Sequence, residues 1–198
     1  MNAAARGRIG EDREDLLVAL SVLCHDLGKP ATTRLVDGRI RALGHDEAGI
    51  APTRSFLGRI TAEPALIEAI VDLVREHLRP SQFFQSGAGD PAIRRLATRV
   101  PIEILVRVAR ADHLGRSTRE ATERRYPAGD WLLGRARALS VARSGPPPLL
   151  SGRHLVACGL EPGPDFRDLL RRAYEAQLDG RVSSVEEALE YLGVGSKS

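Results

Sequence analysis

Apolar residues recur at helical spacing through most of this chain, and nearly every such run ends at a glycine or a proline. The clearest run is "EPALIEAIVDLVREHLRP" (63–80), in which Pro64 fits the first turn of a helix. Its apolar positions form one broad face: Leu66, Ile67, Ile70, Val71, Leu73 and Val74. Aromatic residues make up only 4% of the chain, so leucine, valine, alanine and isoleucine must build the core. The pattern predicts an all-α fold.

Similar amphipathic patterns predict the other helices. Helices are expected over 12–26, 45–61, 90–100, 101–118 and 130–143, with three short ones after residue 153. The segment "VDGRIRALGH" (36–45) interrupts this series. It carries an Asp-Gly pair between two short apolar runs, which is typical of a small hairpin or loop.

The stretch "SGPPPLLSGR" (144–153) is the only proline-rich linker, and we expect a domain boundary there. Residues 1–143 are then predicted to form one helical domain. Residues 144–198 are predicted to form the linker and a small helical C-terminal subdomain.

The two cysteines, Cys24 and Cys158, are far apart and form no CxxC pattern. This argues against a cysteine-ligated zinc site and favours a reducing compartment. The sequence shows no signal peptide and no apolar run of membrane-spanning length, so a cytoplasmic location is expected.

The net charge is +3, and the positive charge is almost all arginine because Lys29 and Lys197 are the only lysines. Guanidinium groups bind phosphate oxygens in pairs, which suits an RNA or nucleotide partner. An arginine bias also follows from genome base composition alone, so charge by itself leaves the partner open.

The stretch "VLCHDLGKPATT" (22–33) places an adjacent His and Asp where an apolar helix ends. A surface turn and a metal site both fit this pattern. Five residues of ligand type lie at or near predicted helix ends: His25, Asp26, His45, His77 and Asp112. Imidazoles and carboxylates suit Mn, Ni, Mg or Fe, and a carboxylate can bridge two such ions. A single histidine at a helix end is also typical of a helix cap, so the spacing alone does not decide between the two.

Four blocks occur in order along the chain: "CHDLGKP", "GHDEAG", "REHLRP" and "ARADHLGR". They resemble the HD-domain metal-dependent phosphohydrolases, and more narrowly the HD region of one branch of bacterial tRNA CCA-adding nucleotidyltransferases. The segment from "LLSGRH" to "EEALEYL" (149–192) is similar to the C-terminal part of those enzymes. The resemblance extends over nearly the whole chain from about residue 12.

This resemblance implies an HD-type helical bundle that holds a divalent metal. Its implied metal ligands are His25, Asp26, His45, His77 and Asp112, of which Asp26 would bridge. Lys29 matches the lysine after the HD pair and would act with Asp26 close to a substrate phosphate. Arg79 and Arg116 lie close in sequence to two of the ligands and could bind phosphate oxygens, although solvated arginines would also explain them.

The implied reaction is metal-assisted hydrolysis of a phosphoester on a nucleotide or an RNA end, such as a 2′,3′-cyclic phosphate or a 2′-phosphate. The sequence departs from the family in two ways. No histidine precedes His25, where HD domains usually supply another ligand, and no "GGxxRD"-like polymerase block is present. We therefore expect a weakened metal site and no nucleotidyltransferase activity from this chain by itself.

Alternative functions remain open at this stage. The chain could be a tRNA- or protein-binding module, or a fragment of a CCA-adding enzyme that lacks its N-terminal nucleotidyltransferase domain, with a relic metal site. It could also bind a nucleotide as a regulator. The arginines that would serve a binding module are Arg167, Arg171, Arg172 and Arg181.

Overall fold

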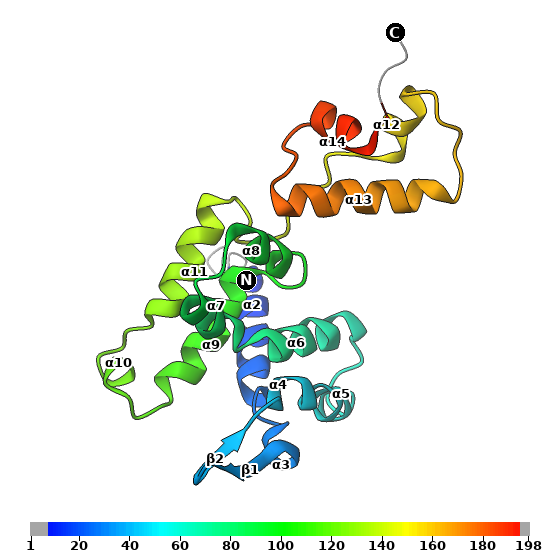
Figure 1. The fold of residues 1–198 in the computed structure, drawn as a ribbon. Helices are drawn as coiled ribbons and strands as arrows, with labels where there is room; N and C mark the ends of the chain where they lie inside the picture. Colours follow the sequence, from blue (N-terminus) through cyan, green and yellow to red (C-terminus); the bar gives the residue numbers. More distant parts are fainter. Residues whose placement is uncertain (1–7, 195–198) are drawn as a thin grey trace.

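The computed structural model describes residues 8–194, and the side chains of residues 13–194. The first and last residues of the two predicted domains, 1–7 and 195–198, lie outside this part. The helices are α2 (Arg8–Cys24), α3 (Lys29–Thr32), α4 (His45–Ala48), α5 (Ile50–Leu57), α6 (Pro64–Glu76), α7 (Arg79–Ser86), α8 (Asp90–Ala97), α9 (Ile102–Leu114), α10 (Arg119–Thr122), α11 (Pro127–Ala138), α12 (Gly152–Ala157), α13 (Asp165–Asp179) and α14 (Val185–Leu192). The strands are β1 (Thr33–Val36) and β2 (Arg39–Ala42). The predicted all-α class is confirmed (Figure 1).

Helix α2 is the central element, because it packs against both α6 and α9 (Figure 1). Between α2, α5 and α6 lies a core that includes Leu57, Ile70 and Val74, all completely buried. Burial of each such side chain contributes about 1.5–3 kcal/mol. A second core joins α8, α9 and α11. These two cores fix the C-terminal ends of α2, α6 and α9 relative to one another.

The interruption predicted over 36–45 is a β-hairpin that begins three residues earlier, at Thr33. Its turn is formed by Asp37 (φ 50°) and Gly38 (φ 69°). Positive φ at both central turn residues matches the right-handed twist of the flanking strands, and Asp-Gly adopts this conformation readily. The sequence signal for the hairpin was therefore the turn pair itself.

Two predicted helices are each divided in the structure. The helix expected over 45–61 is split at Gly49 into α4 and α5, and Pro52 lies in the first turn of α5, where no helical N–H is needed. The run over 63–80 ends at Glu76, and a new helix, α7, begins at Arg79. The helix break therefore lies at Gly49 and not at the proline.

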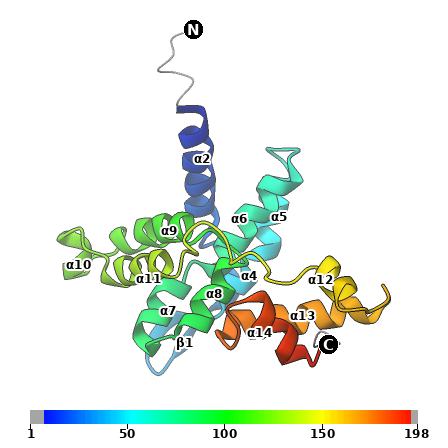
Figure 2. The same ribbon diagram turned by 90° about the horizontal axis from the view of Figure 1, so that it is seen from above.

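The C-terminal helices α12, α13 and α14 lie to one side of the rest (Figure 2). Helices α13 and α14 share a small core of their own with Leu149 and Leu150. Arg95 of α8 joins them to the larger unit through hydrogen bonds to Glu175 (2.9 Å) and Asp179 (2.8 Å) of α13. The segment 139–151 between the two units contains no helix or strand. A boundary at residue 144 stays a prediction.

Over the part of the chain that the structure describes, no helix combines the length and the apolar character needed to cross a bilayer.

Candidate metal centre

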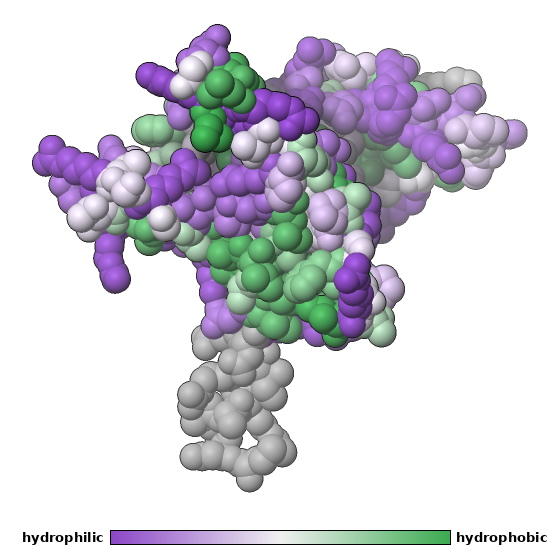
Figure 3. All heavy atoms as spheres, turned by 90° about the horizontal axis from the view of Figure 1, so that it is seen from below, coloured by the Kyte–Doolittle hydropathy of each residue, from purple (hydrophilic) through white to green (hydrophobic). Residues whose placement is uncertain are grey.

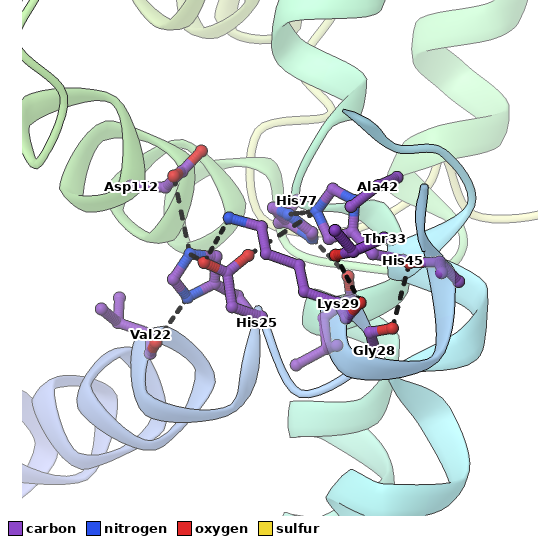
Figure 4. Close-up of polar contacts among 12 residues, drawn as sticks. Val22, His25, Gly28, Lys29, Thr33, Ala42, His45, His77 and Asp112 are labelled. Atoms are coloured by element: carbon purple, nitrogen blue, oxygen red, sulfur yellow. Dashed lines mark hydrogen bonds and ion pairs between the residues drawn. The ribbon is translucent and has the colours of Figure 1, made fainter. Parts of the chain in front are cut away.

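The ends of three helices meet at one place, and the predicted ligands lie there (Figure 4). His25 and Asp26 follow the last residue of α2, His77 follows the last residue of α6, and Asp112 lies in the last turn of α9. His45 begins α4, directly after the hairpin. Residues up to 87 positions apart in sequence thus reach one site, because α2 packs on both α6 and α9.

The three histidines of the site are oriented in the same way. In each ring, Nδ1 donates a hydrogen bond to the carbonyl oxygen three residues earlier, because a carbonyl can only accept. The bonds run from His25 to Val22 (2.6 Å), from His45 to Ala42 (2.7 Å) and from His77 to Val74 (2.6 Å). Such a bond fixes both the tautomer and the ring orientation, and it directs Nε2 toward the centre.

One group of three residues is arranged as metal ligands. Nε2 of His45 lies 3.3 Å from Nε2 of His77 and 3.7 Å from Oδ1 of Asp26. Ligand atoms of these three residues all lie within 4.8 Å of one another. Burial lowers the pKa of His77, which favours its neutral, metal-binding form. Oδ1 of Asp26 is buried and has no hydrogen-bond partner among the described residues, so the donor set fits a divalent cation.

The other oxygen of Asp26 faces a different set of groups. Oδ2 of Asp26 lies 3.3 Å from Nε2 of His25 and accepts a hydrogen bond of 2.6 Å from Nζ of Lys29. The same Nε2 of His25 lies 3.5 Å from Oδ1 of Asp112. Asp26 therefore lies between two halves of the centre, as a bridging carboxylate would.

The second half of the centre consists of His25 and Asp112, with Arg116 paired to Asp112, and its groups carry opposite charges. The hydrogen bond to Asp112 raises the pKa of His25, which favours the imidazolium when no cation competes for Nε2. Burial alone would raise the pKa of Asp112, but the hydrogen bond from His25 and the charge of Arg116 hold it well below its usual range. Nη2 of Arg116 donates to Oδ2 of Asp112 over 2.5 Å.

A cleft of about 460 Å³ opens onto this half of the centre. It is lined by Val22, His25, Asp26, Lys29, Ala111, Asp112, Gly115 and Arg116. Lys29 and Arg116, two of the predicted phosphate contacts, therefore lie at the cleft.

Arg79, the remaining predicted phosphate contact, is placed differently. Its Nε donates to Oε2 of Glu76 over 3.0 Å, and its Nη1 donates to Gln82. Glu76 is 3% exposed and also accepts a hydrogen bond of 2.7 Å from Nε of Arg99. The described polar contacts of Arg79 thus join α6 to α7 rather than line the cleft.

Gly28, the glycine of the block "CHDLGKP", is a positioning residue. A Cβ atom at this position would lie 2.1 Å from the carbonyl oxygen of His45 and 2.6 Å from the amide nitrogen of Gly49. The loop after Asp26 can pack against α4 only because residue 28 has no side chain. In the sequence, the only indication of this close approach was the glycine within "HDLGKP".

Comparison with known proteins finds relatives along most of the chain. It is 34% identical to a CC-adding tRNA nucleotidyltransferase of Thermus thermophilus over 87% of the chain and 38% of the relative. It is 32% identical to an A-adding tRNA nucleotidyltransferase of Deinococcus radiodurans, over 90% of the chain and 41% of the relative. It is also 32% identical to a multifunctional CCA protein of Halorhodospira halophila, over 77% of the chain and 35% of the relative.

The chain therefore spans about two fifths of the length of these relatives and is related to a region of CCA-adding enzymes. No family model matches the chain, and no solved structure matches it. Its assignment as an HD domain stays a prediction.

Proposed function

We propose that this region is an HD-type, metal-dependent phosphohydrolase that acts on nucleotide or RNA-end phosphoesters. The observation that carries the proposal is the set of three ligand atoms from Asp26, His45 and His77, among which Oδ1 of Asp26 is buried without a partner in the described residues. Such an atom is costly to bury unless a cation or a donor satisfies it.

In this proposal Asp26, His45 and His77 hold one divalent ion: Mn, Ni, Mg or Fe. His25 and Asp112, together with the second oxygen of Asp26, would supply ligands for another. When bound, such an ion polarises a phosphoryl oxygen and lowers the pKa of a coordinated water. The hydrogen bonds from Nδ1 of each histidine to the backbone keep every ring in its ligating orientation.

Two cations of the chain itself would bind the substrate phosphate. Lys29 is half exposed beside Asp26, and Arg116 is half exposed beside Asp112, so both can exchange a carboxylate contact for a phosphate oxygen. Arg116 can do so through two parallel N–H groups, whereas Lys29 acts as a point charge. We therefore assign Lys29 a catalytic role: its ammonium group, beside Asp26, would neutralise negative charge on the phosphate of the substrate.

The proposed substrate class and partners follow from the relatives, whose names describe nucleotide addition to tRNA. A tRNA or other RNA end with a 2′,3′-cyclic phosphate or a 2′-phosphate is the proposed substrate. A nucleotidyltransferase domain is the proposed protein partner, because two of the relatives are named tRNA nucleotidyltransferases.

The test is hydrolysis of a 2′,3′-cyclic nucleotide by the full chain during titration with each of the four metal ions. Activity should disappear on chelation, and Asp26→Asn should lower kcat/KM by at least about 100-fold because it removes the bridging charge. Asp130→Asn is the matched control, since Asp130 pairs with Arg110 on the surface, away from the centre. Activity that survives chelation or Asp26→Asn would overturn the proposal.

A second candidate function is a binding region without catalysis. The coverage of only about two fifths of the relatives favours it, because a region of a larger enzyme can act purely as a scaffold. Complete inactivity at saturating metal, together with retained RNA binding through Arg167, Arg171, Arg172 and Arg181, would support this alternative.

A further inference from the structure

Both ends of the β1–β2 hairpin are hydrogen-bonded to residues of the metal centre. At its start, Oγ1 of Thr33 donates a hydrogen bond of 2.7 Å to the carbonyl oxygen of Lys29. At its end, the carbonyl oxygen of Ala42 accepts the hydrogen bond from Nδ1 of His45. From these two anchors the hairpin extends beside α3 and away from α6 and α9 (Figure 1). A molecule that lies along the hairpin would therefore lead to the centre.

The strand register divides the hairpin into two faces. Arg34 is directly opposite Arg41, and Val36 is directly opposite Arg39. Directly opposed residues point to the same side, and successive residues alternate, so all three arginines share one face. Leu35 and Ile40 are opposed on the other face.

Among the side chains that the structure describes, none supplies the arginine face with the counter-charge that many other arginines have. Like charges directly opposite each other across two strands are destabilising. Within residues 13–194, no carboxylate lies within 4.0 Å of a guanidinium nitrogen of Arg34, Arg39 or Arg41. Arg54 and Arg95, by contrast, are both paired. A polyanion on this face would relieve the repulsion between Arg34 and Arg41.

The opposite face is apolar and open to solvent. Leu35 is 75% exposed and Ile40 is 79% exposed. Figure 3 shows the molecule from below, the end at which Figure 1 places the hairpin, and a green patch bordered by purple side chains lies at the top of the view. A ligand with both charged and flat apolar parts matches this pair of faces. Single-stranded RNA has both, in its phosphates and its unstacked bases.

We propose that the β1–β2 hairpin binds the single-stranded RNA that precedes the reacting phosphoester, with phosphates on Arg34, Arg39 and Arg41 and a base or ribose against Leu35 and Ile40. The inference rests on the proposed hydrolase function and narrows its substrate class from nucleotides in general to RNA ends. Each strand has four residues, so the hairpin is about 13 Å long, which allows contact with more than one nucleotide.

The experiment compares two substrates that share one reactive group: a 2′,3′-cyclic mononucleotide, and a single-stranded RNA oligomer that ends in a 2′,3′-cyclic phosphate. Arg34→Gln/Arg41→Gln should lower the ratio of kcat/KM for RNA to kcat/KM for the mononucleotide by about tenfold. The matched control is Arg59→Gln/Arg143→Gln, which removes the same charge from the surface outside the hairpin and should leave the ratio unchanged.

Binding of an RNA oligomer with a 3′-phosphate, followed by fluorescence anisotropy without added metal, gives a readout that needs no catalysis. The double variant should bind more weakly, and the slope of log affinity against log salt should become shallower by about 1.4, as two lost phosphate contacts to a single strand predict. Arg39→Gln alone should shift the slope by about half as much. Leu35→Ser/Ile40→Ser should weaken binding without changing the slope.

The outcomes separate this inference from the function on which it rests. Hydrolysis of both substrates with an unchanged ratio, and RNA binding insensitive to the arginine variants, would overturn the hairpin proposal and leave the hydrolase proposal intact. RNA binding that depends on Arg34 and Arg41, with neither substrate hydrolysed at saturating metal, would support the hairpin contact and overturn the hydrolase. RNA binding unchanged in both hairpin variants would make the exposed apolar face a surface for a protein partner instead.

Discussion

The Nε2 atoms of His45 and His77 lie 3.3 Å apart, and each belongs to a ring whose Nδ1 donates to the backbone three residues earlier. In the neutral form of both rings, two lone pairs therefore face each other, with Oδ1 of Asp26 3.7 Å from the first. Nitrogen and oxygen lone pairs repel at such distances unless a positive charge lies among them. This arrangement is the physical basis for expecting a cation at the centre.

Removal of either ring should weaken metal binding directly. His45→Ala and His77→Ala are each expected to lower the affinity for Mn²⁺ by at least about tenfold, since loss of outer contacts alone typically has effects of this size. Isothermal titration with Mn²⁺ measures the change. His154→Ala is the matched control because His154 caps the distant helix α12. Equal affinities for all three variants would contradict the assignment.

Gly28→Ala should disturb both the fold and the centre. The added Cβ would lie 2.1 Å from the carbonyl oxygen of His45, so the loop must move away from α4. We expect a loss of about 1–3 kcal/mol in the free energy of unfolding, measured by urea denaturation, together with weaker Mn²⁺ binding. Gly134→Ala is the control: a Cβ there meets nothing within 4 Å, and the helix should gain about 0.5–1 kcal/mol. A neutral Gly28→Ala would show that the loop does not depend on this close approach.

Glu76 is expected to matter for stability rather than for chemistry. Its buried carboxylate accepts hydrogen bonds from Arg79 and Arg99, which links α6 to α7 and to the turn that follows α8. Glu76→Gln should lower the free energy of unfolding by about 2 kcal/mol, less than for a fully buried pair because both arginines are half exposed. Glu68→Gln, which breaks the exposed pair with Arg54, should have a much smaller effect on the free energy of unfolding. Similar losses in both variants would argue against the buried link.

The His25–Asp112 contact predicts a pH dependence in metal-free protein. The pKa of His25 is raised above its ordinary value of 6.5, so its stabilisation is fully present below that pH and is lost as the pH rises through the folded-state pKa. The pKa of Asp112 is lowered from its ordinary value of 3.8, so its stabilisation is present above that pH and is lost only as the pH falls through the folded-state pKa. The pair therefore contributes most between these two ordinary values.

Asp112→Asn should accordingly lower the free energy of unfolding more at about pH 5.5 than at about pH 8, measured by urea denaturation with a chelator present. The lost pair with Arg116 contributes equally at both pH values, so the difference reports on His25. Asp130→Asn, whose partner is Arg110, should show no such difference. A larger loss at the higher pH would contradict the proposed protonation states.

The sequence by itself determined the helical class, the turn at Asp37–Gly38 and the residue types of the centre. These follow from short-range physics: apolar periodicity, the backbone freedom of Asp-Gly, and the ligand chemistry of imidazole and carboxylate. The limits of α4, α5 and α7 were not predictable, because Gly49 and the new start at Arg79 reflect how the chain packs after each break.

Only the tertiary structure decided which of these residues meet. His25, His77 and Asp112 come together because α2 packs on α6 and α9 and brings three helix ends to one place, which no local spacing encodes. The same packing gives Gly28 its close contact with α4. It also buries Glu76, whose carboxylate accepts a hydrogen bond from Arg79 and keeps that arginine at the α6–α7 junction. Arg116, by contrast, pairs with Asp112 and lines the cleft. Side-chain chemistry is local, but the partner of each charge is set by burial and by long-range packing, which depend on the whole fold.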